Sequence, residues 1–208
     1  LGSQLRERPL IWVGYLSTTG VYGDRRGEWV SEEDPADPGQ PRSERRHACE
    51  QAWLDSGLPV QILRLPGIYG PGRSVLNSLQ TGKARRILKA DQVFCRIHVD
   101  DIAGACLHLM HRAADGPGPA IVNVSDDCPA APQDLLLYGA DLLKCELPEE
   151  EPFDVASRSM SAMARSFWSE NRRVRNTLLC RQLGYSLLHP DFKAGLQDCF
   201  RQEAQSRS

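Results

Sequence analysis

The stretch Leu10-Ile-Trp-Val-Gly-Tyr-Leu16 is a continuous apolar run of strand length that stops at a cluster of Ser, Thr and Gly. Such an unbroken run is typical of a parallel strand that is buried on both faces. The segment Arg42–Ser56 has helical spacing of its apolar residues and stops at Gly57, and Pro59–Leu65 is a second strand-like run. Strand, helix and strand in this order predict a βαβ crossover, and therefore an α/β fold with a parallel sheet.

The next elements continue this pattern. Arg96–Val99 is short and extended, and Asp100 or Asp101 is placed to cap an apolar helix that runs to Met110. Ala120–Val124 reads as a third strand. Beyond Cys128-Pro129 the periodicity becomes helical, with candidate helices at residues 132–144, 159–168, 175–183 and 191–204.

We therefore expect two parts. Residues 1–128 would form an α/β domain, and residues 129–208 would form a small, mostly helical lobe. The family resemblance of the motifs below implies that the domain binds a nucleotide, that residues 66–95 are partly a substrate loop, and that the lobe binds the substrate.

Composition limits the possible partners. The 208 residues include 25 Lys plus Arg against 27 Asp plus Glu, and the net charge of -2 offers no electrostatic attraction for nucleic acid or an anionic membrane. No run approaches 18 consecutive apolar residues, so we expect no membrane-spanning helix. Seven scattered cysteines without a CxxC pair predict reduced core thiols in a soluble intracellular protein, with no metal site. The compartment, cytoplasm or organelle, stays open because the chain begins with Leu1 rather than Met.

Ser17-Thr18-Thr19-Gly20-Val21-Tyr22-Gly23-Asp24 directly follows the first predicted strand. A hydroxyl at the carboxyl end of a buried strand can donate a hydrogen bond to a substrate oxygen that gains charge during a reaction. Glycines there let the backbone approach a ligand closely. Alone, these residues are better explained by a hydrogen-bonded turn, so the functional interpretation depends on the motifs that follow.

Three further motifs occur in order along the chain. They are Leu63-Arg-Leu-Pro-Gly-Ile-Tyr-Gly-Pro-Gly-Arg73, Arg96-Ile-His-Val-Asp-Asp-Ile-Ala103, and Arg172-Arg-Val-Arg-Asn176 with Leu183-Gly-Tyr185 and Pro190–Leu196 behind it. Together with Ser17–Asp24, they resemble the motifs of extended short-chain dehydrogenases/reductases of the NAD(P)-dependent epimerase/dehydratase-like family. The resemblance covers nearly all of residues 10–200.

The resemblance implies a Rossmann-like, doubly wound parallel sheet that binds NAD or NADP and a polar, sugar-like or nucleotide-linked substrate. Thr18 falls on the position of the residue that polarises the substrate. The implied cofactor contacts are Leu16, Ser17, Arg46, Pro66, Gly67 and Ile68. The implied substrate contacts are Thr19, Tyr22, Arg73, Arg96, Arg172 and Asn176. Arg73, Arg172 and Asn176 are about equally explained as solvated surface side chains, and for His98 and Asp100 we expect a structural role.

The chain departs from this family at its usual catalytic pair. Family members carry Tyr-x-x-x-Lys on the helix after the first of these strands, and Glu50-Gln51 fixes the register of that helix. In this register Arg42 occupies the Tyr position and Arg46 the Lys position. Because arginine stays protonated at any working pH, Arg42 cannot act as a general acid or base, although Arg46 could still donate to a ribose. The family's glycine-rich phosphate-binding loop is also absent, so we expect about 100 further residues before Leu1 that carry it.

These features leave three hypotheses. The first is an enzyme of the epimerase, dehydratase or reductase type, in which Tyr22, His98 or a water molecule carries the proton. The second is a non-catalytic dinucleotide-binding protein that acts as a sensor or a structural subunit, as loss of the catalytic pair would produce. The third is a truncated product that docks on another protein. A homodimer through Arg42–Ser56 is compatible with each of them, with Trp53 and Leu54 as apolar contacts or as core residues.

Overall fold

The structure, a computed structural model, describes residue 5 and residues 7–205. Its central sheet has three parallel strands in the order β1-β3-β7, namely Val13–Thr18, Val60–Leu65 and Ile121–Asn123. The register pairs Val13 with Val60 and Thr18 with Leu65, so β1 and β3 end at the same level. The predicted α/β class and parallel sheet are confirmed.

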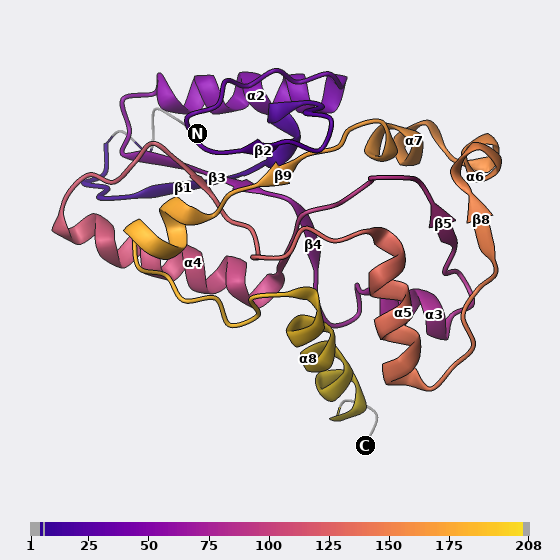
Figure 1. Cartoon of the computed structure of the whole chain (residues 1–208). Helices are drawn as coiled ribbons and strands as arrows, with labels where there is room; N and C mark the ends of the chain where they lie inside the picture. Colours follow the sequence, from indigo (N-terminus) through magenta and orange to yellow (C-terminus); the bar gives the residue numbers. More distant parts are fainter. Residues whose placement is uncertain (1–4, 6, 206–208) are drawn as a thin grey trace.

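Helices cover both faces of this sheet (Figure 1). Helix α2 (Pro41–Leu54) connects β1 to β3, and α4 (Val99–Arg112) precedes β7 on the opposite face. The side chains of Leu63, Leu65, Ile102 and Leu109 belong to the buried core between the sheet and α4. This arrangement is the doubly wound, Rossmann-like pattern expected from the sequence.

The prediction that the first strand is buried on both faces is wrong for the described chain. Ile11 precedes β1 and is 63% exposed, and Leu16 within β1 is 43% exposed. The reason is that β1 lies at the edge of the described sheet, where it pairs with β3 and packs against α2. An unbroken apolar run therefore identified the strand but not the burial of each face.

Short two-stranded pairs surround the central sheet. They are β2 (Trp29–Val30) with β9 (Arg173–Val174), β4 (Gly67–Tyr69) with β6 (Arg96–His98), and β5 (Arg86–Leu88) with β8 (Glu150–Pro152). The 3-10 turns are η1 (Thr19–Tyr22) and η2 (Ala113–Asp115). The remaining helical elements are α3 (Val75–Gln80), α5 (Pro132–Leu143), α6 (Phe153–Ser159), α7 (Ala162–Trp168), the π-helical η3 (Leu178–Gln182) and α8 (Phe192–Gln205).

Two predicted helices differ from those observed. The segment 159–168 contains the end of α6 and all of α7, because the Ser161 side chain accepts a hydrogen bond from the backbone N–H of Ala164 and starts a new helix. The segment 175–183 contains only the short η3. Residues after 128 also return to the first part, since β8 and β9 pair with strands from before that point, and the division at residue 128 stays a prediction.

The expected cap of α4 is also different. His98, rather than Asp100 or Asp101, is the N-cap residue, and its Nδ1 accepts from the backbone N–H of Asp100 at 3.3 Å. Asp101 instead accepts hydrogen bonds from the backbone N–H groups of Leu188 and His189. The carboxylate therefore holds the segment that leads into α8, a long-range role that local capping rules do not indicate.

The prediction that the cysteines are core residues is wrong for part of the set, although all seven are free thiols. Cys95 and Cys199 are buried, whereas Cys49 and Cys145 are exposed. Among the described residues, no helix combines the length and the apolar character needed to cross a bilayer.

A buried ion pair joins α2 to the central sheet. The Glu50 carboxylate, fully buried, receives hydrogen bonds from Arg64 Nε at 3.2 Å and Arg64 Nη2 at 2.7 Å. Ser17 Oγ on β1 donates to the same carboxylate at 2.5 Å. The Arg64 guanidinium also lies over the Tyr22 ring, 4.6 Å from its centroid. One carboxylate thus connects α2, β1 and β3, and through Arg64 it reaches η1.

Removal of Glu50 should destabilise the protein strongly, because it leaves the Arg64 charge buried without a partner. We expect Glu50→Ala to lower the free energy of unfolding by about 3–5 kcal/mol, measured by urea denaturation. Glu44→Ala on the exposed side of α2 is the matched control, with a loss of about 1 kcal/mol or less. Equal losses in the two variants would contradict this role of Glu50.

Candidate functional site

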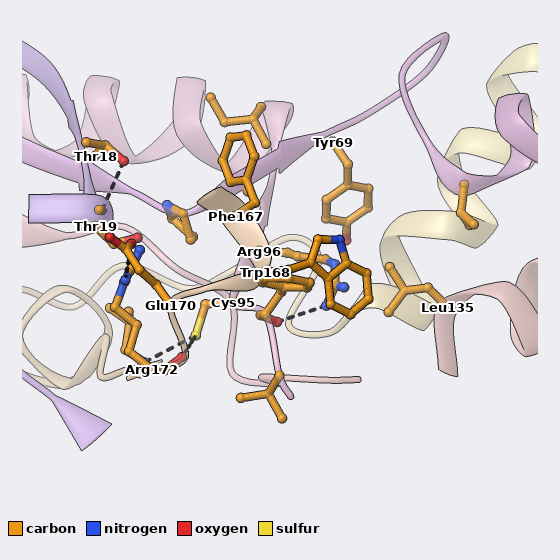
Figure 2. A pocket seen from close by; sticks show the side chains of 18 of the residues that line it. Thr18, Thr19, Tyr69, Cys95, Arg96, Leu135, Phe167, Trp168, Glu170 and Arg172 are labelled. Carbon is orange, nitrogen blue, oxygen red and sulfur yellow. Dashed lines mark hydrogen bonds and ion pairs between the residues drawn. The ribbon is translucent and has the colours of Figure 1, made fainter. Parts of the chain in front are cut away.

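A cavity of about 460 Å³ lies at the carboxyl ends of β1 and β3 and extends toward α7 (Figure 2). In open α/β sheets this edge is where ligands bind. Nine of the residues singled out in the sequence line the cavity: Thr18, Thr19, Arg42, Pro66, Gly67, Ile68, Arg73, Arg96 and Arg172. The structure therefore brings together segments that are up to about 150 residues apart in the chain.

Thr18 is held at the junction of β1 and η1. It is the N-cap residue of η1, and its Oγ1 accepts a hydrogen bond from the backbone N–H of Gly20 at 3.1 Å. Accepting this bond leaves the Thr18 O–H free to donate to a ligand in the cavity. Gly20 is required for close packing, because a Cβ atom there would lie 2.8 Å from Ser43 Oγ. The turn is therefore tied to the start of α2, and it presents a hydroxyl donor to the cavity.

Arg42 fixes the opposite wall. Its Nη1 donates to Ser166 Oγ at 2.5 Å, and its guanidinium lies 3.9 Å from the centroid of the Phe167 ring. These contacts join the beginning of α2 to α7. The position that carries Tyr in the motif therefore holds a permanent cation engaged by a hydroxyl and an aromatic face.

Arg46 lies one turn further along α2 and outside the cavity lining. Its Nη1 donates to the backbone carbonyl of Leu16 at 3.0 Å and to Tyr15 Oη at 3.3 Å. These contacts place Arg46 beside the backbone of β1, where the predicted cofactor contact Leu16 lies. The side chain is exposed, so its other N–H groups remain available to a ribose bound at this edge.

Two of the arginines in the cavity are anchored by the protein itself. Arg96 donates to the carbonyl oxygens of Phe94 at 2.8 Å and Ala130 at 3.2 Å, and burial lowers the pKa of its guanidinium. Arg172 donates to the Gly23 carbonyl at 2.6 Å and to Glu170 Oε2 at 2.8 Å (Figure 2). Both guanidinium groups keep further donors for an anionic ligand.

The third arginine of the cavity, Arg73, differs from Arg96 and Arg172 in its exposure to solvent. Arg73 lines the cavity and is exposed. Glu170 supplies the carboxylate among these cations, and its Oε1 is buried without a hydrogen-bond partner in the described structure. A ligand hydroxyl would satisfy that oxygen.

Besides Leu16 and Arg46, three further predicted contact residues lie outside the cavity lining. Ser17 is committed to Glu50, and Tyr22 is fully buried with its Oη donating to Asn123 Oδ1 at 2.8 Å. Burial also raises the Tyr22 pKa. Asn176 Nδ2 donates to the carbonyl of Ser125 at 2.9 Å and to Asp127 Oδ1 at 2.7 Å. None of the three lines the cavity, so direct contact with a substrate stays a prediction for Tyr22 and Asn176 and would require rearrangement.

Sequence reasoning missed the aromatic wall formed by Phe167 and Trp168 at the end of α7. Phe167 is 54% exposed, and Trp168 packs edge-to-face on Phe94 with ring centroids 5.4 Å apart. No catalytic motif contains these residues. The one signal is a pair of adjacent aromatics at the end of a short helix.

Asp126 is an unusual buried carboxyl next to this site. Its Oδ1 accepts from the backbone N–H of Cys128 at 3.2 Å, while Oδ2 is buried without a partner among the described residues. Burial raises the pKa of Asp126 to about 8, although the Cys128 N–H and Arg96 act against this rise. The group is therefore protonated in the folded protein at neutral pH.

This raised pKa predicts a pH dependence of stability. The folded carboxyl keeps its proton up to about pH 8, whereas an unfolded Asp loses it near pH ~4. The native state binds more protons between these values, so the free energy of unfolding should fall as pH rises, by at most about 1.4 kcal/mol per pH unit from this group.

The test is urea denaturation of wild type and Asp126→Asn at several pH values between these limits. We expect the wild type to lose stability more steeply with rising pH than Asp126→Asn. Asp115→Asn, at an exposed position, should keep the slope of the wild type. Identical slopes for wild type and Asp126→Asn would show that Asp126 ionises normally.

The fold and this edge define a class of protein: a parallel α/β domain with a ligand cavity at the carboxyl ends of its strands. The model of the NAD dependent epimerase/dehydratase family matches residues 5–125. The chain belongs to this family.

Individual relatives are consistent with this assignment. Protein YeeZ of Escherichia coli (strain K12) is 28% identical over 181 residues, which are 85% of this chain. These residues are 58% of that protein, so the chain spans less than two thirds of the curated relative it matches.

Two solved structures extend the comparison. A functionally unknown conserved protein from Silicibacter pomeroyi DSS is 44% identical, with a TM-score of 0.87, and the match covers 99% of this chain and 71% of that one. The dTDP-glucose 4,6-dehydratase of Bacillus anthracis str. Ames, solved in complex with NAD, is 19% identical with a TM-score of 0.75. That match covers 100% of this chain and 66% of the dehydratase, and it shows the shared fold.

Proposed function

We propose that this protein binds a nicotinamide dinucleotide, NAD or NADP, with its nicotinamide end in the cavity beside Thr18 and the Pro66–Ile68 turn. The observation that carries the proposal is the meeting of these two segments at the carboxyl edge of β1 and β3. Family membership and the NAD found with the related dehydratase fold support it.

The substrate we propose is polar and anionic, of a sugar-like or nucleotide-linked kind. The cavity offers three arginines, Arg73, Arg96 and Arg172, of which two are oriented by backbone carbonyls. Guanidinium groups recognise phosphate and carboxylate groups through paired hydrogen bonds. The unpartnered Glu170 Oε1 is a complementary acceptor for a hydroxyl. In this arrangement Thr18 donates to the reacting oxygen.

In the proposed register, the site lacks the Tyr that carries the proton in catalytic members of the family. Arg42 cannot exchange a proton near neutral pH, and Tyr22 is buried away from the cavity. A dinucleotide-binding protein without turnover is therefore the second candidate function, and the contacts of Arg42 with Ser166 and Phe167 favour it. Those contacts give Arg42 a role in holding α7 rather than in a reaction.

Dinucleotide binding is tested at the turn that would meet the nicotinamide. Ile68 is 39% exposed in the cavity, and Ile68→Glu places a carboxylate that must lose its hydration there. We expect the affinity of the full-length protein for NADPH or NADH to fall by about 10-fold or more, an effect of about 1.4 kcal/mol or more, measured by fluorescence titration. Val155→Glu on exposed α6 should bind as the wild type does, and equal affinity for Ile68→Glu would contradict this placement.

The missing proton carrier is tested by restoring it. We expect the double variant Arg42→Tyr with Arg46→Lys to raise hydride transfer to the dinucleotide above the wild type by about 100- to 10,000-fold, the usual range for general acid–base catalysis. The measurement is NAD(P)H absorbance with full-length protein and a panel of UDP- and dTDP-sugars.

Arg42→Phe with Arg46→Lys is the matched control, because it differs by one hydroxyl and should gain nothing. Rapid turnover by the wild type, unchanged in both double variants, would show that another group carries the proton. Dinucleotide binding with no turnover in any of the three proteins would favour the non-catalytic function.

A further inference from the structure

Four metal-ligating side chains converge outside the cavity, at the amino-terminal end of α4. They are His98 at the end of β6, Asp100 in the first turn of α4, His189 in the segment before α8, and Asp198 on α8. One ligand atom of each lies within 4.8 Å of the others. The two imidazole rings are 4.0 Å apart between centroids.

The hydrogen bonds of His189 decide where its proton lies. Asp101 is fully buried and accepts from the backbone N–H groups of Leu188 at 2.7 Å and His189 at 3.0 Å. Asp101 Oδ2 lies 3.0 Å from His189 Nδ1, so Nδ1 carries the hydrogen. In the neutral ring the lone pair is then on Nε2, which faces Asp198 Oδ2 at 3.7 Å.

His98 shows the same arrangement from the other side. Its Nε2 faces Cys199 Sγ at 3.6 Å, while Nδ1 accepts a long 3.3 Å hydrogen bond from the backbone N–H of Asp100. A backbone N–H can only donate, so Nδ1 carries the lone pair. This nitrogen lies 3.7 Å from Asp100 Oδ2, again too far for a hydrogen bond.

Two imidazole nitrogens and two carboxylate oxygens thus lie around one small space. A cation bound at His98 Nδ1 would replace the long 3.3 Å hydrogen bond that this nitrogen accepts from the backbone N–H of Asp100. The histidines are each oriented by a second partner, Asp101 or Cys199, as metal-bound imidazoles generally are. We propose that His98, Asp100, His189 and Asp198 bind one divalent transition metal ion of the zinc class.

The ligand set selects the kind of ion. Imidazole nitrogen suits Zn²⁺, Co²⁺ and Ni²⁺, whereas Mg²⁺ and Ca²⁺ prefer all-oxygen sites. His98 and His189 are buried, Asp198 is half-buried and Asp100 is exposed, and four protein ligands are the number found in a structural zinc site. The ion would join the start of α4 to α8, and α8 supplies Leu196 to the lining of the cavity. The site is thus separate from the dinucleotide edge but supports the wall that faces it.

The test is Co²⁺ and Zn²⁺ binding by full-length protein that has been dialysed against a chelator. We expect one Co²⁺ per chain with the visible absorption of a tetrahedral nitrogen and oxygen site, without a thiolate charge-transfer band, and displacement by Zn²⁺ but not by Mg²⁺ or Ca²⁺. Asp198→Asn and His189→Gln should each weaken binding by at least about 10- to 100-fold, the loss that even an outer-shell change causes.

His111→Gln, at an exposed position later in α4, is the matched control and should bind as the wild type does. Asp198 also accepts from Arg201 and Gln202, so circular dichroism of each variant confirms that it is folded. No stoichiometric binding by the wild type would overturn the proposal. Binding that is equal in folded Asp198→Asn and His189→Gln would overturn it as well, because the ion would then lie elsewhere.

Discussion

The buried carboxylate of Glu50 is the constraint on which the geometry of the site depends. It neutralises Arg64 from β3, accepts the hydroxyl of Ser17 from β1, and comes from the helix that connects the two strands. Breaking such a pair leaves an uncompensated charge in the core. The carboxyl ends of β1 and β3 are therefore fixed relative to α2, and Thr18 and Arg42 are fixed on either side of the cavity. We propose that this geometry holds the dinucleotide edge, with Arg42 and Arg46 at the positions that the resemblance gives to the family's catalytic pair.

The sequence predicted the central crossover well, because its signals are local and strong. Apolar runs marked β1 and β3, Gly57 marked the end of the helix region, and the Pro66-Gly67 turn placed the loop beside Thr18. These local signals did not predict contacts between distant segments. Arg42 contacts the aromatic wall of α7 beside the cavity, and no spacing rule relates residue 42 to residue 167.

The inability of local sequence signals to predict long-range contacts also explains other differences between the predicted and the observed structure. Asp101 was expected to cap its own helix, but it bonds to backbone groups 87 and 88 residues away. The candidate metal ligands likewise come from three separated segments, whereas sequence rules recognise closely spaced ligands. Tyr22 fits a motif position, yet full burial and a hydrogen bond to Asn123 commit it to the core. In each case the sequence indicated the chemistry of the residue but not the residue that it contacts.

We propose that this protein has a dinucleotide site in which Arg42 occupies the place of the proton donor. The most direct measurement is a crystal structure of the full-length protein with NADPH or NADH. We expect the nicotinamide ring against Pro66–Ile68, near the Thr18 hydroxyl, with Arg42 still bonded to Ser166. A dinucleotide whose nicotinamide lies outside this cavity, or a cavity that Phe167 and Arg42 keep closed to it, would contradict the claim.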